Sequence, residues 1–222
     1  MKIELLDACY VAGSHNVLTN IQFCLEGAQQ ALIIGRSGSG KTTLSRLLCG
    51  VLLPSGGHCS MDGPRTDVGF VEHHPTFHEE LSAFDNVLVA AAARGLDKER
   101  ATASALELFA DLHISHIRSV PICNLSSWER ILVAIARAWI GDTTVIIADQ
   151  SFDGYDEVSI RSILDTLERI NINQRSVVVT TAQPSLALLL PNASVYELRD
   201  GLLTNISKLP SEDLQTQSGE PT

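Results

Sequence analysis

The sequence lacks the patterns that identify secreted and membrane-spanning proteins. Its five cysteines include no C-x-x-C pair, and an odd number of cysteines without a signal peptide favours a reducing compartment. We expect no signal peptide, because the chain begins with strand-like sequence. The apolar stretches are too short to span a bilayer, and the stretch 131–140 is interrupted by Arg137. Any role at a membrane therefore requires a partner chain.

Basic residues are also few. The chain has 16 Lys and Arg against 26 Asp and Glu, and its formal net charge is −10. This balance argues against a general nucleic-acid-binding surface, so we expect no nucleic-acid partner. Apolar residues, in contrast, make up 45% of the 222 residues. That is enough for the core of one large domain, or of one domain with a small subdomain.

Residues 35–42, with the sequence GRSGSGKT, form a complete phosphate-binding motif. They fit G-x-x-x-x-G-K-[ST] at every fixed position, between an apolar run at 31–34 and a segment of helical spacing that ends at Gly50. Glycines let backbone N–H groups close around an anion, and a helix N-terminus adds a favourable dipole. Lys41 supplies charge for the β and γ phosphates, and Thr42 offers a hydroxyl to Mg²⁺. The motif predicts binding of a nucleoside triphosphate.

The remaining sequence predicts strands that alternate with helices. Alternating apolar residues between Ile3 and Leu25 favour an antiparallel pair, and an Asp-Gly turn near the end predicts a hairpin. Asp97 is expected to cap a helix that runs to about Leu112. The pattern indicates an α/β fold with a mostly parallel sheet. The predicted strands are 31–34, 58–61, 68–71, 144–148, 176–180, 195–198 and 202–206, and the predicted helices are 43–49, 84–94, 98–112, 126–140 and 157–170.

A carboxylate follows the strand at 144–148. Asp149 stands where a second group that orients Mg²⁺ is expected, so Thr42 and Asp149 are the candidate metal ligands. A cap on the following helix is the structural alternative for Asp149.

The stretch from Leu125 to Ala138 then resembles the signature motif and following helix of the ATP-binding cassette (ABC) ATPases, usually written LSGGQ-R-Q-R-V-A-I-A-R-A. Residues 68–75 resemble the segment that carries the family's glutamine loop, and Leu198–Gly201 resembles its late hairpin. Tyr10 resembles the aromatic residue that stacks on adenine. The signature positions are Leu125, Ser126, Ser127, Trp128 and Glu129, and the candidate nucleotide-binding residues are Tyr10, Gly35, Arg36, Ser37, Gly38, Ser39, Gly40, Lys41, Thr42, Thr43 and Asp149.

The resemblance covers roughly residues 1–206 and implies a nucleotide-binding domain. It implies a P-loop NTPase core with a mostly parallel sheet, an antiparallel β subdomain and a helical subdomain at about 84–140. The polar tail at 207–222 is expected to be disordered. The family binds ATP and Mg²⁺, dimerises head to tail and drives a transmembrane permease. The chain is accordingly expected to be cytoplasmic and to reach the inner face of a membrane through that partner, as a homodimer or as a heterodimer with another ABC ATPase.

Several positions depart from the family's pattern. Gln150 stands where the family has the glutamate that polarises water, and an amide cannot accept the proton. Thr181 or Ala182 stands where the switch histidine is expected, and His73 occupies the glutamine-loop position. Ser127 and Trp128 replace the signature glycines, and a Trp there should obstruct a partner's γ-phosphate. These changes predict that ATP is bound but hydrolysed weakly or not at all.

Other interpretations of the same residues remain open. His73, His74 and His78 could form a metal cluster, although their spacing matches no strong zinc pattern. Asp153, Asp156 and Glu157 could form a carboxylate pair for hydrolysis, but a dimer-contact loop before a helix start is favoured. No Asn-Lys-x-Asp sequence is present, which argues against a guanine-specific GTPase.

Two functions thus follow from the sequence. The first is an ATP-binding subunit of an ABC-type transporter with weak or absent hydrolysis. The second is a non-hydrolysing pseudo-ATPase that acts as a nucleotide-gated regulatory scaffold. A soluble ABC protein of DNA repair or chromosome maintenance is disfavoured, because the chain leaves no room for a long coiled coil and is acidic.

Overall fold

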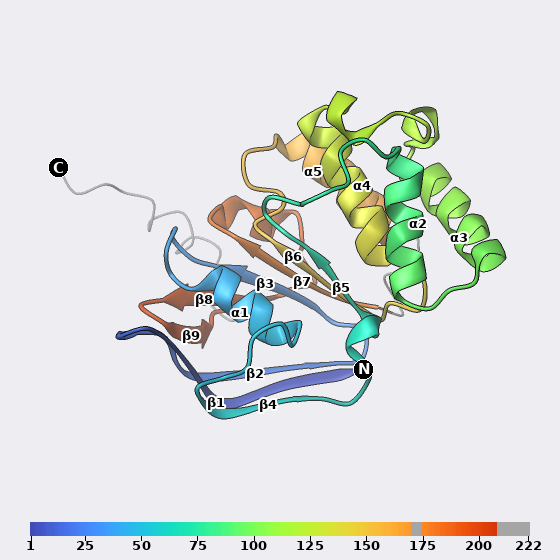
Figure 1. The fold of residues 1–222 in the computed structure, drawn as a ribbon. Coiled ribbons are helices and arrows are strands. Elements are labelled where there is room, and N and C mark those ends of the chain that lie inside the picture. The colour runs from blue at the N-terminus through green and yellow to red at the C-terminus, as the bar shows by residue number, and fades with distance from the viewer. Residues whose placement is uncertain (170–174, 208–222) are drawn as a thin grey trace.

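Two β-sheets and the helices packed on them make up the computed structural model, which describes residues 1–169 and 175–207 (Figure 1). Strands and helices follow one another in the order that the sequence predicts. The predicted end of the last helix at residue 170 and nearly all of the polar tail lie outside the described residues.

The larger sheet has six strands in the order β5-β6-β7-β3-β8-β9. Its first five strands are parallel, and β9 pairs antiparallel with β8 through the predicted Asp-Gly turn. The prediction of a mostly parallel sheet is therefore confirmed. The strands are β3 Gln30–Ile34, β5 Val68–Val71, β6 Val145–Asp149, β7 Ser176–Thr181, β8 Ser194–Arg199 and β9 Leu202–Asn205.

The smaller sheet is antiparallel and has the order β2-β1-β4. β1 Lys2–Ala12 pairs with β2 His15–Glu26, as predicted, and β4 Gly56–Met61 pairs with the other edge of β1. This sheet lies below the parallel sheet in Figure 1, with helix α1 between the two.

The helices are α1 Lys41–Leu48, α2 Ala83–Ala93, α3 Lys98–Asp111, α4 Ser127–Trp139 and α5 Glu157–Arg169. Side chains of Ser82, Asp97 and Ser126 cap α2, α3 and α4 by accepting hydrogen bonds from backbone amides. The predicted cap at Asp97 is thus confirmed. Short 3₁₀ helices occupy Arg65–Asp67, Ser115–Ile117, Ile122–Asn124 and Pro184–Leu188.

The parallel sheet separates two hydrophobic cores. Successive residues of a strand point to opposite faces, so Leu32 and Ile34 join the core beneath α2 to α5, while Ile33 joins the core that contains α1 and the antiparallel sheet. Ile146 and Ile147 of β6 divide in the same way. Both faces are therefore covered, which explains why these strands read as continuous apolar runs.

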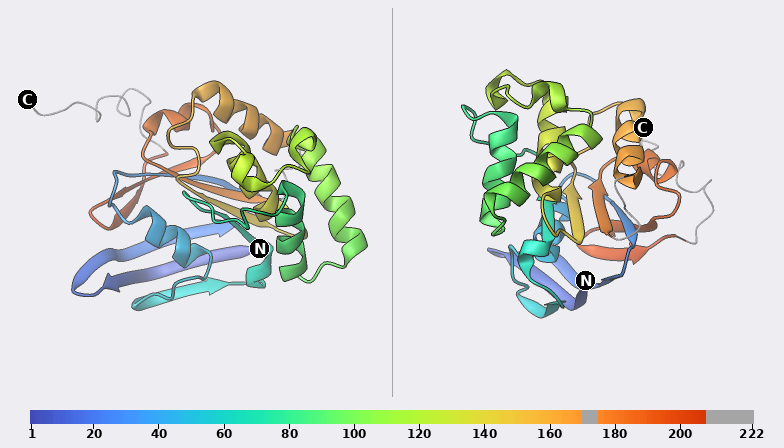
Figure 2. Two further views of the ribbon diagram at one scale, coloured as in Figure 1. Left: turned by 45° about the horizontal axis from the view of Figure 1, so that its top comes forward. Right: turned by 90° about the vertical axis from the view of Figure 1, so that its right-hand side faces the viewer.

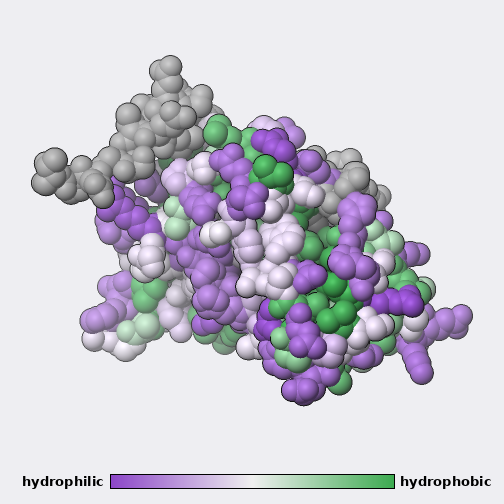
Figure 3. Space-filling model, turned by 90° about the horizontal axis from the view of Figure 1, so that it is seen from above, coloured by the Kyte–Doolittle hydropathy of each residue, from purple (hydrophilic) through white to green (hydrophobic). Residues whose placement is uncertain are grey.

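The views in Figure 2 show α2, α3 and α4 gathered at one end of the parallel sheet, away from β8 and β9. On the face seen from above, hydrophobic residues form a patch right of centre among hydrophilic ones (Figure 3). Among the described residues, no helix has the length and apolar character needed to cross a membrane.

A close approach between β5 and α4 fixes how the helical region sits on the sheet. A Cβ atom added to Gly69 of β5 would lie 2.1 Å from the carbonyl oxygen of Ala138 in α4. Backbone atoms cannot be that close to a side chain, so only glycine fits here without a shift of the helix.

We expect Gly69→Ala to lower the free energy of unfolding by at least about 1–3 kcal/mol, because α4 must move away from β5. Urea denaturation followed by circular dichroism measures this loss. Gly56→Ala is the matched control, since its added Cβ would lie 3.8 Å from the Cβ of Cys9, an ordinary contact. Equal stability of the two variants would contradict the inference.

Candidate nucleotide-binding site

The carboxyl ends of β3, β5, β6 and β7 meet at one edge of the parallel sheet. Gly35 follows β3, the segment with His73 follows β5, and Asp149 and Thr181 end β6 and β7. The topology therefore brings together site candidates that are far apart in the sequence. The edges of open parallel sheets where strands end are common sites of ligand binding.

The phosphate loop is a tight turn between β3 and α1. A Cβ atom on Gly35 would meet Ser39 Oγ at 2.5 Å and the Leu198 carbonyl oxygen at 2.6 Å, and Gly40 has a φ of 103°. Arg36, Ser37 and Gly38 are exposed at the tip of the loop. The two glycines are thus required by packing and by backbone conformation respectively.

The start of α1 presents unpaired donors to this loop. Gly40 is its N-cap and makes no side-chain cap, and the amides of Lys41, Thr42 and Thr43 have no acceptor among the described residues. Within the same described part of the chain, the hydroxyl of Ser39 is buried and has no hydrogen-bond partner. Unpaired amides at a helix N-terminus are a ready-made anion site. The residues present therefore fit a phosphate group.

Lys41 is folded back against the loop. Its Nζ donates to the carbonyl oxygens of Gly35 at 2.7 Å and Arg36 at 2.9 Å, and the residue is only 3% exposed. Burial lowers the pKa of the ammonium, and the carboxylates of Asp153 and Asp149 oppose that shift. An ammonium has three N–H donors, so one donor is available to a phosphate oxygen without loss of either loop contact.

Asp149 is buried at the end of β6. Its Oδ1 accepts hydrogen bonds from Ser45 Oγ of α1 at 3.1 Å and from Thr180 Oγ1 of β7 at 2.8 Å. The carboxylate therefore faces α1, the helix that begins with Lys41 and Thr42. A carboxylate and a hydroxyl are ligand types that Mg²⁺ accepts, and the donor set of Thr42 and Asp149 fits that ion. No cluster of three or more His, Cys, Asp or Glu that could hold a metal occurs in residues 1–169 and 175–207, so the histidine alternative finds no support there.

Gln150 turns sharply at the end of β6. Its φ is 51°, and its backbone N–H donates to the carbonyl oxygen of Thr180. Its side-chain Nε2 donates to Thr42 Oγ1 at 3.3 Å. The amide therefore lies beside the hydroxyl that the motif assigns to Mg²⁺.

His73 contacts the same residue from the other side. Its Nδ1 lies 2.8 Å from the carbonyl oxygen of Gln150. A carbonyl only accepts, so Nδ1 carries the proton in this contact. The glutamine-loop position and the Gln150 position are thus in direct contact.

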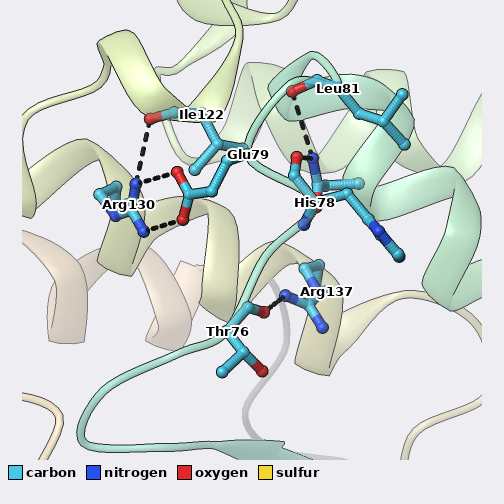
Figure 4. A network of polar contacts seen from close by, with 8 residues as sticks. Thr76, His78, Glu79, Leu81, Ile122, Arg130 and Arg137 are labelled. Atoms are coloured by element: carbon cyan, nitrogen blue, oxygen red, sulfur yellow. Dashed lines mark hydrogen bonds and ion pairs between the residues drawn. The ribbon is translucent and has the colours of Figure 1, made fainter.

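The segment that carries His73 is anchored by α4 (Figure 4). Arg130 forms a bidentate pair with Glu79 at 2.8 and 2.6 Å, and Arg137 donates to the carbonyl oxygen of Thr76. Both guanidinium groups also lie over the ring of Phe77. The position of the segment is therefore set by the same helix that begins at the signature residues.

The signature residues contact another part of the same chain. Ser126 and Glu129 form a reciprocal capping box at the start of α4, and Leu125 is buried beside it. The carbonyl oxygen of Ser127 accepts a hydrogen bond from the Tyr155 hydroxyl at 3.1 Å. The rings of Trp128 and Tyr155 lie 5.0 Å apart. The aromatic pair fills space that two glycines would leave open.

Tyr10 lies on β1, opposite Leu18 of β2. The neighbouring Val17 lies within 3.3 Å of where a Cβ of Gly40 would be, so β2 runs against the phosphate loop. Tyr10 is half-buried against the core of the antiparallel sheet. Strand β2 therefore lies between Tyr10 and the phosphate loop.

Comparison with known proteins agrees with this geometry. The family model described as ABC transporter matches residues 18–153, which is more than half of the chain. The chain belongs to the ABC transporter family. The match includes the phosphate loop, the signature residues and Asp149.

Relatives of this ABC chain carry transporter names. It is 32% identical over 204 residues to the lipoprotein-releasing system ATP-binding protein LolD 1 of Rhodopirellula baltica, covering 85% of this chain and 88% of the relative. It is 28% identical over 220 residues to the macrolide export ATP-binding/permease protein MacB of Campylobacter jejuni, covering 93% of this chain. The chain spans only 34% of that MacB relative's length.

Solved structures of ABC transporter cassettes share the fold. An ATP-binding subunit of an ABC transporter superposes with a TM-score of 0.84 at 20% identity, covering 98% of this chain and 99% of the other. A dimeric bacterial ABC transporter cassette gives 0.81 at 23% identity, covering 92% and 98%. These likenesses confirm the α/β P-loop fold predicted from the sequence.

Sequence reasoning missed several residues that shape the ABC site. The sequence does not predict a contribution from Ser45, Thr180 or Tyr155, and it favours a dimer-contact loop over a hydrolytic carboxylate pair for Asp153. One signal was available: Ser45 is a polar residue on the buried face of α1, between Leu44 and Leu47. Such a position usually has a hydrogen-bond partner. The partner itself is visible only in three dimensions.

We expect Thr180→Val to lower the free energy of unfolding by about 1.5–3 kcal/mol. Valine has nearly the shape of threonine but lacks the hydroxyl that donates to the buried Asp149 carboxylate. The backbone N–H of Gln150 also loses the Thr180 hydroxyl, which accepts from it at 3.1 Å. Urea denaturation at neutral pH measures the change. Thr204→Val on β9 is the control, since that residue is exposed, and a similar loss in both variants would contradict the role of the Thr180 hydroxyl.

Proposed function

We propose that this chain binds Mg-ATP at the phosphate loop and couples nucleotide-dependent dimerisation to a membrane permease, with slow or absent hydrolysis. The observation that carries the proposal is the contrast within one site. The anion cradle is complete around the buried Lys41, whereas the side chain beside Thr42 is the amide of Gln150. The names of the LolD and MacB relatives support a transporter role and a permease partner.

Each part of the cradle has a defined task in this proposal. The amides of α1 and the Lys41 ammonium would bind phosphate oxygens. Thr42 and Asp149 would hold Mg²⁺, which neutralises phosphate charge when it is bound. Ser45 and Thr180 orient the Asp149 carboxylate. Tyr10 would contact the base from the antiparallel sheet.

The proposed site lacks a well-placed group to accept the proton of an attacking water molecule. An amide side chain can hold a water molecule but cannot take its proton. His73 contacts the carbonyl oxygen of Gln150 through Nδ1, and its side chain is exposed. At the position expected for the switch histidine, which is Thr181 or Ala182, the Thr181 hydroxyl donates a hydrogen bond to Asp153. Slow turnover follows from these three positions together.

The proposed dimer would also be affected. Trp128 and Tyr155 pack against each other where the signature of one chain is expected to meet ATP on the other. A homodimer would combine two altered signatures with two altered catalytic positions. In a heterodimer with an intact ABC ATPase, one composite site would still contain Trp128. The helical region at about 84–140 would carry that signature as a subdomain.

A second candidate function is a nucleotide-gated regulatory scaffold without turnover. The hydrogen bond from the Gln150 side chain to Thr42 favours the scaffold function. The amide would orient a candidate Mg²⁺ ligand but supplies no base for hydrolysis. The two functions differ in whether ATP turnover accompanies the partner's activity. Turnover as fast as that of an intact ABC ATPase, abolished by Lys41→Ala, would exclude the scaffold and contradict slow hydrolysis.

We expect Lys41→Ala to weaken ATP binding by about 10- to 100-fold, because charge-assisted hydrogen bonds to phosphate are lost. Isothermal titration calorimetry with Mg-ATP measures this, and circular dichroism checks that the variant is folded. Lys98→Ala, at an exposed position that begins α3, is the matched control. Unchanged affinity in Lys41→Ala would refute the assignment of the phosphate loop.

We expect Gln150→Glu to raise the turnover of the assembled complex by at least about tenfold, since a positioned base contributes roughly 10²–10⁴-fold when the rest of the site is intact. Phosphate release under saturating Mg-ATP is the measurement. Gln29→Glu adds the same charge at an exposed residue and should leave turnover unchanged. Equal stimulation by both variants would show an effect of net charge alone.

A further inference from the structure

Asp153 has contacts that the role of a dimer-contact residue does not explain. Its Oδ1 accepts a hydrogen bond from the hydroxyl of Thr181, and its Oδ2 accepts one from the backbone N–H of Ala182 at 3.0 Å. Both carboxylate oxygens are therefore bound to the residues at the switch position. Thr181 is completely buried, and its hydroxyl also accepts from the Gln183 amide at 2.9 Å.

The switch position is joined directly to the phosphate loop. The N–H of Gly35 donates to the carbonyl oxygen of Thr181 at 3.1 Å, and the carbonyl oxygen of Gly35 accepts from Lys41 Nζ. One short chain of hydrogen bonds thus runs from Asp153 through Thr181 and Gly35 to Lys41. The Asp153 carboxylate therefore lies next to the segment that is hydrogen-bonded to the first residue of the loop.

The side chain of Asp153 also lines a cavity, which is bordered by the Gln150 and signature positions rather than by the phosphate loop. Asp153 lines this cavity of about 480 Å³ together with Gln150, His73, Ser127 and Tyr155. The carboxylate is half-buried, and of the two carboxylates that raise the pKa of Lys41 it has the larger effect. Its charge is therefore felt at the ammonium that is expected to bind the β and γ phosphates.

Asp149 and Asp153 differ in what their charges face. Asp149 lies beside Ser45 of α1, where a divalent cation would offset its charge. Asp153 is bound by a hydroxyl and a backbone amide of the switch segment, and within residues 1–169 and 175–207 neither candidate metal ligand, Thr42 or Asp149, is hydrogen-bonded to it. Like charges at short range repel, and the repulsion is strong where water is partly excluded. A triphosphate bound at Lys41 would bring more negative charge toward Asp153 than a diphosphate would.

We propose that Asp153 determines nucleotide selectivity: while it is bound to Thr181 and Ala182, its carboxylate disfavours the terminal phosphate of a nucleoside triphosphate and leaves binding of a diphosphate nearly unaffected. Triphosphate binding then requires Asp153 to leave the switch segment. This inference rests on the proposed function, because it assumes that the phosphate loop binds adenine nucleotides. It explains why a carboxylate, rather than a neutral side chain, caps the switch position.

Competition titrations with a fluorescent nucleotide measure the test quantity, the ratio of the affinities for Mg-ADP and a non-hydrolysable Mg-ATP analogue. We expect the wild-type chain to bind the diphosphate at least as tightly as the triphosphate. Asp153→Asn should improve triphosphate affinity by about tenfold, because one negative charge near the terminal phosphate is removed, with little change for the diphosphate. Asp153→Ser removes the same charge with a smaller side chain and should give the same shift if the Asn variant folds poorly.

Asp156→Asn is the matched control, since that exposed carboxylate in the same loop caps α5 by accepting from the N–H and hydroxyl of Ser159. It should leave the ratio unchanged. A ratio that does not move in either Asp153 variant, or that moves equally in Asp156→Asn, overturns the selectivity role. Weaker triphosphate binding in the Asp153 variants also overturns it.

Failure of the proposed function has a separate signature. In that case the wild-type chain binds neither nucleotide and Lys41→Ala changes nothing, so the selectivity role falls with it. If nucleotide binding depends on Lys41 but the ratio of diphosphate to triphosphate affinity is unaltered in the Asp153 variants, only the inference about Asp153 is refuted.

Discussion

The hydrogen bonds of the buried Asp149 carboxylate are the interaction on which the site depends. One oxygen joins three elements, because Asp149 ends β6, Ser45 belongs to α1 and Thr180 belongs to β7. A buried carboxylate is costly unless donors satisfy it. The same contacts therefore stabilise the carboxyl edge of the sheet and hold α1, with Lys41 and Thr42 at its first turn, beside that edge. The stability of this region and the geometry of the phosphate site have a common origin.

Much of the fold follows from local patterns in the sequence. The apolar runs at β3, β6 and β7 indicate strands covered on both faces. The glycine-rich phosphate-loop motif before α1 predicts a strand on one side of it and a helix on the other. The capping side chains of Asp97 and Ser126 mark the starts of α3 and α4 because cap chemistry is local. The order of strands in the larger sheet is not local, because neighbouring strands such as β3 and β7 are far apart in the chain, and no pattern in the sequence predicts it.

The site was predictable where a motif names the residue, and not where only contact defines the role. Lys41, Thr42 and Asp149 were found because phosphate and Mg²⁺ chemistry restricts residue type at fixed spacing. Thr180 and Asp153 act through partners that lie about thirty residues away, Asp149 and Thr181, and no spacing rule covers such pairs. The pairing of Trp128 with Tyr155 is of the same kind: the sequence shows that Trp128 is unusual there, but its neighbour appears only after folding.

Helix α4 connects parts of the molecule that are distant in the chain. Its first turn carries the signature residues, Arg130 and Arg137 hold the segment after β5, and Ala138 near its last turn contacts Gly69 without room for a methyl group. Rotation or sliding of α4 would break the contacts of Arg130 and Arg137 and the close fit against Gly69. A displacement of the segment with His73 that preserves these contacts would therefore carry the signature end along with it.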